Sequence, residues 1–152
     1  MSISASIDIT LSNFNNRRRS ASSIINVLMG HGWNLHHNNN INYQPIGSKE
    51  IVPWVYESIS FESLTKILDT KENLHEINGV MMTWNNTEVG GDFLFWPEGN
   101  PKDFSLNLNA FKPMIQLQEW YEIIDFQWYL EKLLPPLNDE FGVEYFSCKQ
   151  SK

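Results

Sequence analysis

The chain has few of the residues that build stapled, metal-bound or membrane-spanning proteins. Cys148 is the single cysteine in 152 residues, which excludes an internal disulfide framework and a cysteine-rich zinc site. No apolar run approaches the ~18 residues of a membrane-spanning helix. The first eleven residues alternate apolar and polar side chains and have no basic start, so they do not resemble a signal peptide. We therefore expect a cytoplasmic protein with no membrane partner.

The sequence also lacks the motifs of common catalytic sites. It contains no G-x-x-x-x-G-K-[ST], no G-x-G-x-x-G and no G-x-S-x-G. Gly30 and Gly32 flank His31, but they follow a predicted helix, and a helix C-terminus repels phosphate. His36 and His37 are adjacent, so in a strand they point to opposite faces and cannot chelate one metal. We expect no enzyme, no cofactor and no metal.

Basic residues are scarce, and the formal net charge is −7. The only basic cluster is Arg17, Arg18 and Arg19. Residues 50–103 hold ten acidic side chains against three lysines, and residues 119–144 hold seven against one. A general nucleic-acid binder needs a basic face, so direct nucleic-acid binding is not expected. An acidic face could instead steer a basic protein partner, although acidity alone also serves solubility.

Apolar residues, in contrast, are plentiful. The chain is 41% hydrophobic and 13% aromatic, which is too apolar for a disordered protein. No linker divides it, and its length suits one hydrophobic core. We expect a single domain over residues 1–152.

Hydrophobic periodicity predicts a series of strands and helices. Strands are expected at 3–11, 33–43, 51–59, 77–84, 89–96, 104–108 and 143–147, and helices at about 17–29, 61–74 and 119–134. Gly30 and Gly32 would end the first helix as left-handed caps, and Gly90-Gly91 would form a bulge. Pro135-Pro136 would stop the last helix. This order predicts an α+β fold, an antiparallel or mixed sheet with about three helices on one face and ferredoxin-like β-α-β elements.

The candidate partner-binding residues surround the hairpin at 77–96, where acidic and aromatic side chains alternate. If Phe93 and Phe95 face one side of their strand, Asp92, Leu94 and Trp96 face the other. Either helices cover both faces, or one face binds something. Aromatic residues are enriched at interface hot spots, although many here must also build the core. The predicted binding residues are Glu88, Asp92, Trp96, Glu98 and Asp103.

Several segments resemble small bacterial immunity proteins that neutralise polymorphic toxins, including those of contact-dependent growth inhibition systems. The resemblance lies in the opening Ser-Ile-Ser-Ala-Ser-Ile strand, Gly30-His31-Gly32-Trp33, Pro45-Ile46-Gly47 and Gly79-Val80-Met81-Met82-Thr83-Trp84. The resemblance implies a cytoplasmic protein that binds the C-terminal domain of one cognate toxin and occludes its active site. Many such toxins are nucleases with basic clefts, which an acidic surface would complement.

Two other classes of function stay open. The aromatic residues could line the pocket of a small-molecule binding module or of a small ferredoxin-like enzyme. The alternating strands could also offer an edge at which a structural subunit pairs with a copy of itself.

Overall fold

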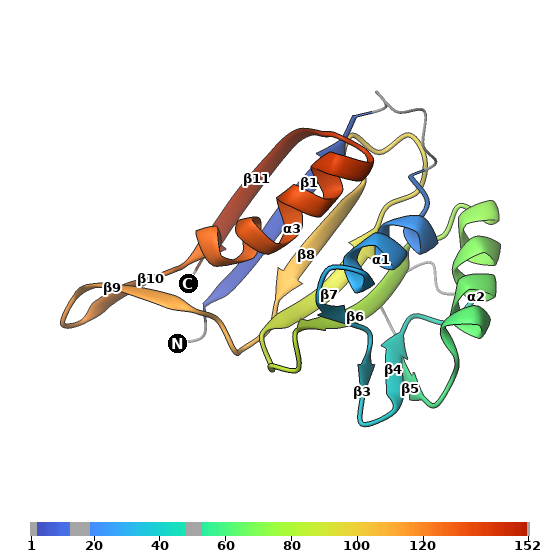
Figure 1. Cartoon of the computed structure of the whole chain (residues 1–152), viewed down its shortest axis with the longest axis horizontal. Coiled ribbons are helices and arrows are strands. Elements are labelled where there is room, and N and C mark those ends of the chain that lie inside the picture. The colour runs from blue at the N-terminus through green and yellow to red at the C-terminus, as the bar shows by residue number, and fades with distance from the viewer. Residues whose placement is uncertain (1–2, 13–18, 48–52, 152) are drawn as a thin grey trace.

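A computed structural model describes residues 3–12, 19–47 and 53–151. Within them, three helices lie against one face of an antiparallel sheet (Figure 1). The helices are α1 (Ala21–Met29), α2 (Phe61–Asn73) and α3 (Phe126–Glu140). The predicted α+β fold is therefore confirmed. None of the helices in the described ranges is long and apolar enough to cross a membrane.

Nine strands form the main sheet, and two more form a separate hairpin. The main strands are β1 (Ser4–Leu11), β2 (Trp33–Asn34), β3 (His36–His37), β4 (Asn40–Tyr43), β5 (Val55–Glu57), β6 (Asn78–Trp84), β7 (Gly90–Phe95), β8 (Phe104–Leu108) and β11 (Val143–Ser151). Their order is β11-β1-β8-β7-β6-β4-β3, with β2 on β6 and β5 on β4. β9 (Met114–Gln118) and β10 (Tyr121–Ile124) pair with each other. A β-α-β unit does open the chain, but β8, β7 and β6 lie between β1 and β2.

Strand alternation separates the two faces of the sheet. Ile7 and Ile9 of β1 point to the helices and are fully buried, as are Phe93 of β7 and Leu106 of β8. The alternate residues form rows across the opposite face, where the cross-strand register places Ser105 beside both Asp8 and Leu94. We call this second surface the helix-free face.

The last predicted helix is wrong at both ends. Residues 119–120 form the turn of the β9–β10 hairpin, and α3 begins only after Asp125, whose carboxylate caps the backbone N–H of Trp128. The helix then continues through Pro135 and Pro136 to Glu140. The prolines were expected to stop the helix, because each removes a backbone donor.

A tryptophan on a distant strand supplies a hydrogen bond where the second proline has none. Pro136 cannot donate to the carbonyl of Lys132, its partner one helical turn back. Trp33 Nε1 donates to that carbonyl oxygen instead, at 3.2 Å. Trp33 and Lys132 are 99 positions apart, so local sequence patterns do not reveal the contact.

Trp33 is also the centre of the aromatic core. Its ring centroid lies 5.6 Å from that of Trp84 and 5.4 Å from that of Phe93, both in edge-to-face geometry. Gly32 permits this packing, because a Cβ there would lie 2.6 Å from the Trp84 ring. Gly32 has the expected left-handed backbone, with φ of 103°. Gly30 does not, since its φ of −68° is helical.

Other element boundaries differ from the predictions in smaller ways. The strand expected at 33–43 is divided into β2, β3 and β4, because Asn38 and Asn39 take positive φ and turn the chain. The last strand extends to Ser151 rather than ending at residue 147. Residues 17–18 and 51–52, which begin one predicted helix and one predicted strand, lie outside the described residues. The helix at 61–74 and the hairpin at 77–96 are confirmed.

The expected bulge at Gly90-Gly91 is absent, because both glycines keep regular register with β6. They serve a different purpose, which is close approach of neighbouring backbones. A Cβ at Gly91 would lie 1.9 Å from the Asn107 carbonyl oxygen, and one at Gly90 would lie 2.1 Å from that of Met82.

We predict that Trp33→Phe lowers the free energy of unfolding by about 1–3 kcal/mol, because it leaves the Lys132 carbonyl buried without a donor. Pro136→Ala restores a backbone N–H at the helical position that bonds this carbonyl. The cost of Trp33→Phe should therefore fall by about 1 kcal/mol in the Pro136→Ala background. Urea unfolding of the four proteins measures this coupling. Additive effects would show that the indole N–H does not compensate for the proline.

Candidate functional site

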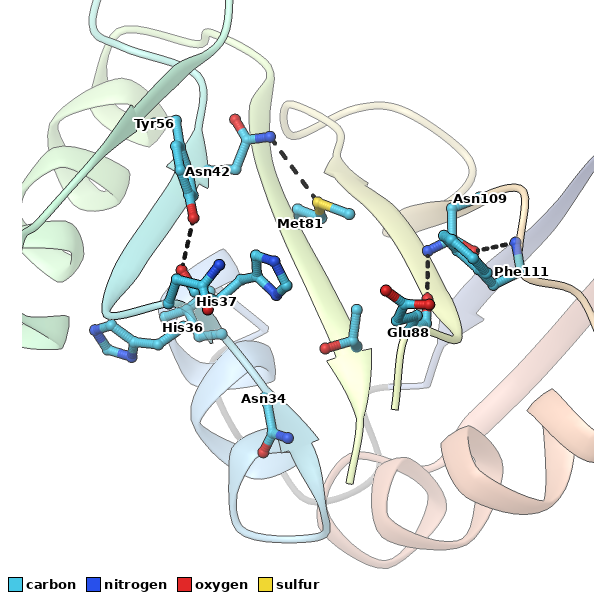
Figure 2. Close-up of a pocket in the computed structure, with 12 residues that line it drawn as sticks. Asn34, His36, His37, Asn42, Tyr56, Met81, Glu88, Asn109 and Phe111 are labelled. Atoms are coloured by element: carbon cyan, nitrogen blue, oxygen red, sulfur yellow. Dashed lines mark hydrogen bonds between the residues drawn. The ribbon is translucent and has the colours of Figure 1, made fainter. Parts of the chain in front are cut away.

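The helix-free face is hollowed beside strand β6 (Figure 2). β2 pairs with β6 at Trp33 and Asn34, and β4 pairs with β6 again only at Tyr43. Between these contacts the chain forms the β3–β4 hairpin instead, in which His36 pairs with Ile41. The resulting hollow has a volume of about 570 Å³.

The hollow has two walls on either side of β6. Figure 2 shows Met81 between them, with His37, Asn42 and Tyr56 on one side and Glu88, Asn109 and Phe111 on the other. The first wall comes from β3, β4 and β5. The second comes from the β6–β7 turn and from the segment that joins β8 to β9.

Hydrogen bonds hold the polar side chains of both walls. On the first wall, Asn42 Nδ2 donates to Met81 Sδ at 3.9 Å, and Tyr56 Oη donates to the His37 carbonyl at 2.8 Å. On the second wall, Asn109 Nδ2 donates to the Glu88 carbonyl at 2.8 Å. Asn34 Nδ2 donates to Asn86 Oδ1 at 3.1 Å. Each of these amide nitrogens, and the phenol, thus donates to a protein atom. The walls are consequently ordered before anything binds.

The five predicted binding residues do not form one acidic surface. Glu88 lines the hollow, and Asp92 lies on the helix-free face beside Met81. The other three, Trp96, Glu98 and Asp103, line a polar cleft of about 490 Å³ past the far end of β7. Strand β7, six residues and about 20 Å long, lies between Glu88 and Trp96, and Asp92 lies within that strand. The structure therefore brings the predicted residues together only in two separate groups.

In the cleft past the end of β7, Trp96 and Asp103 make contacts within the protein. Asp103 Oδ2 accepts a hydrogen bond from the Leu11 backbone N–H at 2.7 Å and lies 3.6 Å from Arg19 Nη1. Trp96 Nε1 donates to Ser105 Oγ at 2.9 Å. Lys102 Nζ lies 5.1 Å from the centroid of the Trp96 ring, a cation–π contact. Trp96 and Asp103 thus help to hold the sheet and its loops.

Asp8 belongs to this internal network. Although it is charged and lies on a strand face without helices, it is only 9% exposed. Its Oδ1 accepts from Ser105 Oγ at 2.6 Å, and its Oδ2 lies 3.5 Å from Lys102 Nζ and 3.9 Å from Lys149 Nζ. The cations near this end of the face are therefore already matched by a buried carboxylate.

Asp92, unlike Asp8, has no lysine or arginine within ion-pair distance among the described residues. Burial raises the pKa of its carboxyl above the ordinary 3.8. Its neighbours across the strands are Met81 and Asn107, and no ion pair to Asp92 is present among the described residues. A carboxylate held this way costs stability unless a cation approaches it.

A second binding surface is the β9–β10 hairpin, which projects from the body of the sheet (Figure 1). Ile115 and Ile123 are paired across the strands and share one face of the hairpin, and the register shifts between Tyr121 and Glu122 near the turn. At the turn, the Trp120 side chain is 81% exposed and its ring lies 6.0 Å from that of Tyr121. The hairpin thus presents an apolar face with an aromatic tip to solvent.

The base of the hairpin is tied to the domain. Ile124 is buried in the core, and its N–H donates to Gln150 Oε1 of β11 at 2.9 Å. The Asp125 N–H donates to the Pro113 carbonyl at 2.9 Å. The exposed tip is therefore carried on an anchored support.

The sequence interpretation missed this hairpin because residues 119–134 were assigned to a helix. A period-two signal was present, since Ile115 and Leu117 alternate with Gln116 and Gln118. Glu119 and Glu122, at the start of the predicted helix, lie in the turn and on β10.

The described residues contain no group of three His, Cys, Asp or Glu side chains that could hold a metal ion. Burial, with a smaller contribution from the Asp8 charge, raises the pKa of the Cys148 thiol. A raised thiol pKa disfavours the thiolate, which is the nucleophilic form.

No family model, curated protein or solved structure matches this chain. The interpretation of the site therefore depends on its own geometry.

We predict that Asp92→Asn raises the free energy of unfolding at pH 7. The folded protein holds the Asp92 proton more tightly than the unfolded chain does, so stability falls as pH rises above 3.8 through the raised pKa. The gain of the variant should disappear below pH 3.8, where both states of the wild type are protonated. Urea unfolding across this pH range measures the difference, with the exposed Glu98→Gln as control. A destabilised Asp92→Asn protein at pH 7 would mean that the carboxylate has a stabilising partner.

Proposed function

We propose that this chain is an immunity-type protein that binds and neutralises a cognate bacterial toxin domain. The observation that carries the proposal is the projecting β9–β10 hairpin with its exposed aromatic tip. Exposed apolar patches on an otherwise polar surface mark sites of protein association. Tryptophan and tyrosine are among the side chains most often found at the centres of such interfaces.

The hairpin can contribute substantial binding free energy. Burying the 81% of the Trp120 side chain that is exposed would release roughly 3–5 kcal/mol before the costs of association. Ile115 and Leu117 are also exposed and add apolar area on the same element. Because the hairpin base is anchored to β11 and to the start of α3, little backbone ordering is needed on binding.

The negative charge of the chain favours a basic protein partner. The chain carries a formal charge of −7, and Glu119 and Glu122 lie beside the apolar tip. Such a surface speeds encounter with a basic protein, such as a nuclease whose cleft binds phosphates. In this proposal the hairpin occludes that cleft in the cytoplasm, and the chain itself catalyses nothing. The residues Glu88, Asp92, Trp96, Glu98 and Asp103 stay predictions as direct contacts.

A second candidate function has one observation in its favour. β11 is an edge of the main sheet, it is nine residues long, and its Tyr145 and Phe146 are exposed. An edge of this length could pair with a second copy of the chain. A monomeric mass at high protein concentration would remove this alternative.

We predict that Trp120→Ala abolishes neutralisation without unfolding the protein. The toxin domain encoded beside this chain's gene is expressed with and without the chain, growth is scored, and the complex is isolated from the same cells. The wild type should restore growth and form a one-to-one complex. Trp120→Ala should weaken the complex by about 30-fold or more, the effect of losing a hot spot of about 2 kcal/mol. Its unfolding free energy should stay within about 0.5 kcal/mol of the wild type.

The matched control is Tyr145→Ala, which removes another exposed aromatic side chain, from the β11 edge. It should leave both growth and complex unchanged. Failure of the wild type to rescue cells from a toxin shown to be active, with no complex recovered, would remove the proposed function. Loss of binding in Tyr145→Ala but not in Trp120→Ala would move the interface to the sheet edge.

A further inference from the structure

The hollow on the helix-free face offers a ligand several hydrogen-bond acceptors, beside donors that include the second N–H of each asparagine amide and the rings of His36 and His37. The amide nitrogens of Asn34, Asn42 and Asn109 each donate to a protein atom. The described contacts leave the Asn34 and Asn42 side-chain oxygens, and the Glu88 carboxylate, without a donor. An occupant that satisfies these oxygens must bring several N–H donors.

The charge of the hollow favours a cation. Among the residues that line it, Glu88 is the only carboxylate, and no lysine or arginine is present. Asp92 lies next to Met81 on the same face, again without an ion pair among the described residues. Two described lysines of this face, Lys102 and Lys149, lie within 4 Å of Asp8 instead. An anion would thus meet the Glu88 carboxylate, with no lysine or arginine among the lining residues to compensate it.

The apolar part of the lining suits a flat cation. Tyr56 and Phe111 lie on opposite sides of Met81 and are each about half exposed (Figure 2). A guanidinium group stacks on aromatic rings and carries five N–H donors in one plane. A lysine ammonium is compact and lacks a planar group that stacks on a ring.

The position of the hollow suggests where the cation comes from. Phe111 belongs to the segment that leads directly into β9, whose first residue is Met114. A protein that covers the base of the β9–β10 hairpin as well as its tip would therefore have part of its surface close to the hollow. The volume of about 570 Å³ accommodates a long side chain together with part of the backbone that carries it.

We propose that the hollow receives an arginine side chain of the protein partner, with Glu88 pairing the guanidinium and Phe111, on the same wall, stacking on it. The proposal rests on the proposed function in one respect, which is that the occupant belongs to a protein that binds this chain. It assigns the two acidic residues at the ends of β7 different roles: Glu88 binds the cation and Glu98 does not.

The test is a titration of the isotope-labelled full chain with N-acetyl-Gly-Arg-Gly-amide, followed by amide NMR shifts. The control peptide carries citrulline, which has the shape of arginine without its charge. We expect saturable shifts at Met81, Thr83 and Asn42 with a dissociation constant of about 1 mM, and at least about tenfold weaker binding of the citrulline peptide. Shifts that do not saturate, or equal binding of the two peptides, would overturn the proposal.

Matched variants locate the binding site. Glu88→Gln should weaken binding of the arginine peptide at least about fivefold, because the substitution removes the ion pair while keeping the shape of the side chain. Glu98→Gln should bind like the wild type. Equal effects of the two variants would show only general electrostatic attraction and would overturn the assignment. A lysine peptide that binds as tightly as the arginine peptide would also contradict it.

A final titration distinguishes two sources of the guanidinium group, an arginine side chain in a protein and free arginine. Free arginine should bind more weakly than the peptide, and tighter binding of free arginine would indicate a small-molecule site instead. Since the titration needs no toxin, its failure is distinguishable from failure of the proposed function. Growth rescue without peptide binding would remove the arginine site alone, whereas peptide binding without rescue would leave the site and remove the toxin as its partner.

Discussion

The hydrogen bond from Trp33 to the Lys132 carbonyl is the contact on which the rest of the structure depends. It supplies a donor to the Lys132 carbonyl, one of the two carbonyls that the proline pair in α3 leaves without a helical N–H. The same indole ring packs on Trp84 and Phe93, so one side chain joins the last helix to the middle of the sheet. Gly32 makes room for this arrangement, because any side chain there would collide with Trp84.

Placing Trp33 in the core also creates the candidate site. β2 is held on β6 at Trp33 and Asn34, so the following chain turns away as the β3–β4 hairpin before it rejoins β6 at Tyr43. The gap between these two contacts is the hollow on the helix-free face. The site is therefore a consequence of how the strands of the sheet pair.

The acidic residues divide into two groups with different physical roles. Asp8 and Asp103 lie close to cations and accept internal hydrogen bonds, although burial still raises the pKa of the Asp103 carboxyl. Asp92 is partly buried without an ion pair among the described residues, and burial raises its pKa. Glu88 faces the hollow. Asp92 and Glu88 thus lie, without an ion pair among the described residues, on the face where we propose that a basic partner binds.

Sequence periodicity by itself determined the elements whose stability is local or whose faces are simple. Alternation predicted β1, the β6–β7 hairpin and β8, and the apolar stripe after the Ser60 cap predicted α2. Tertiary contacts decided the rest. The period of two at Ile115 was not recognised as a strand. The helix α3 continues through the prolines that were expected to end it, and Trp33 bonds one of the carbonyls left without a donor. The five candidate binding residues lie in two groups, one at the hollow and one past the end of β7. These outcomes depend on which distant side chain satisfies a donor, an acceptor or a charge, and no local pattern contains that information.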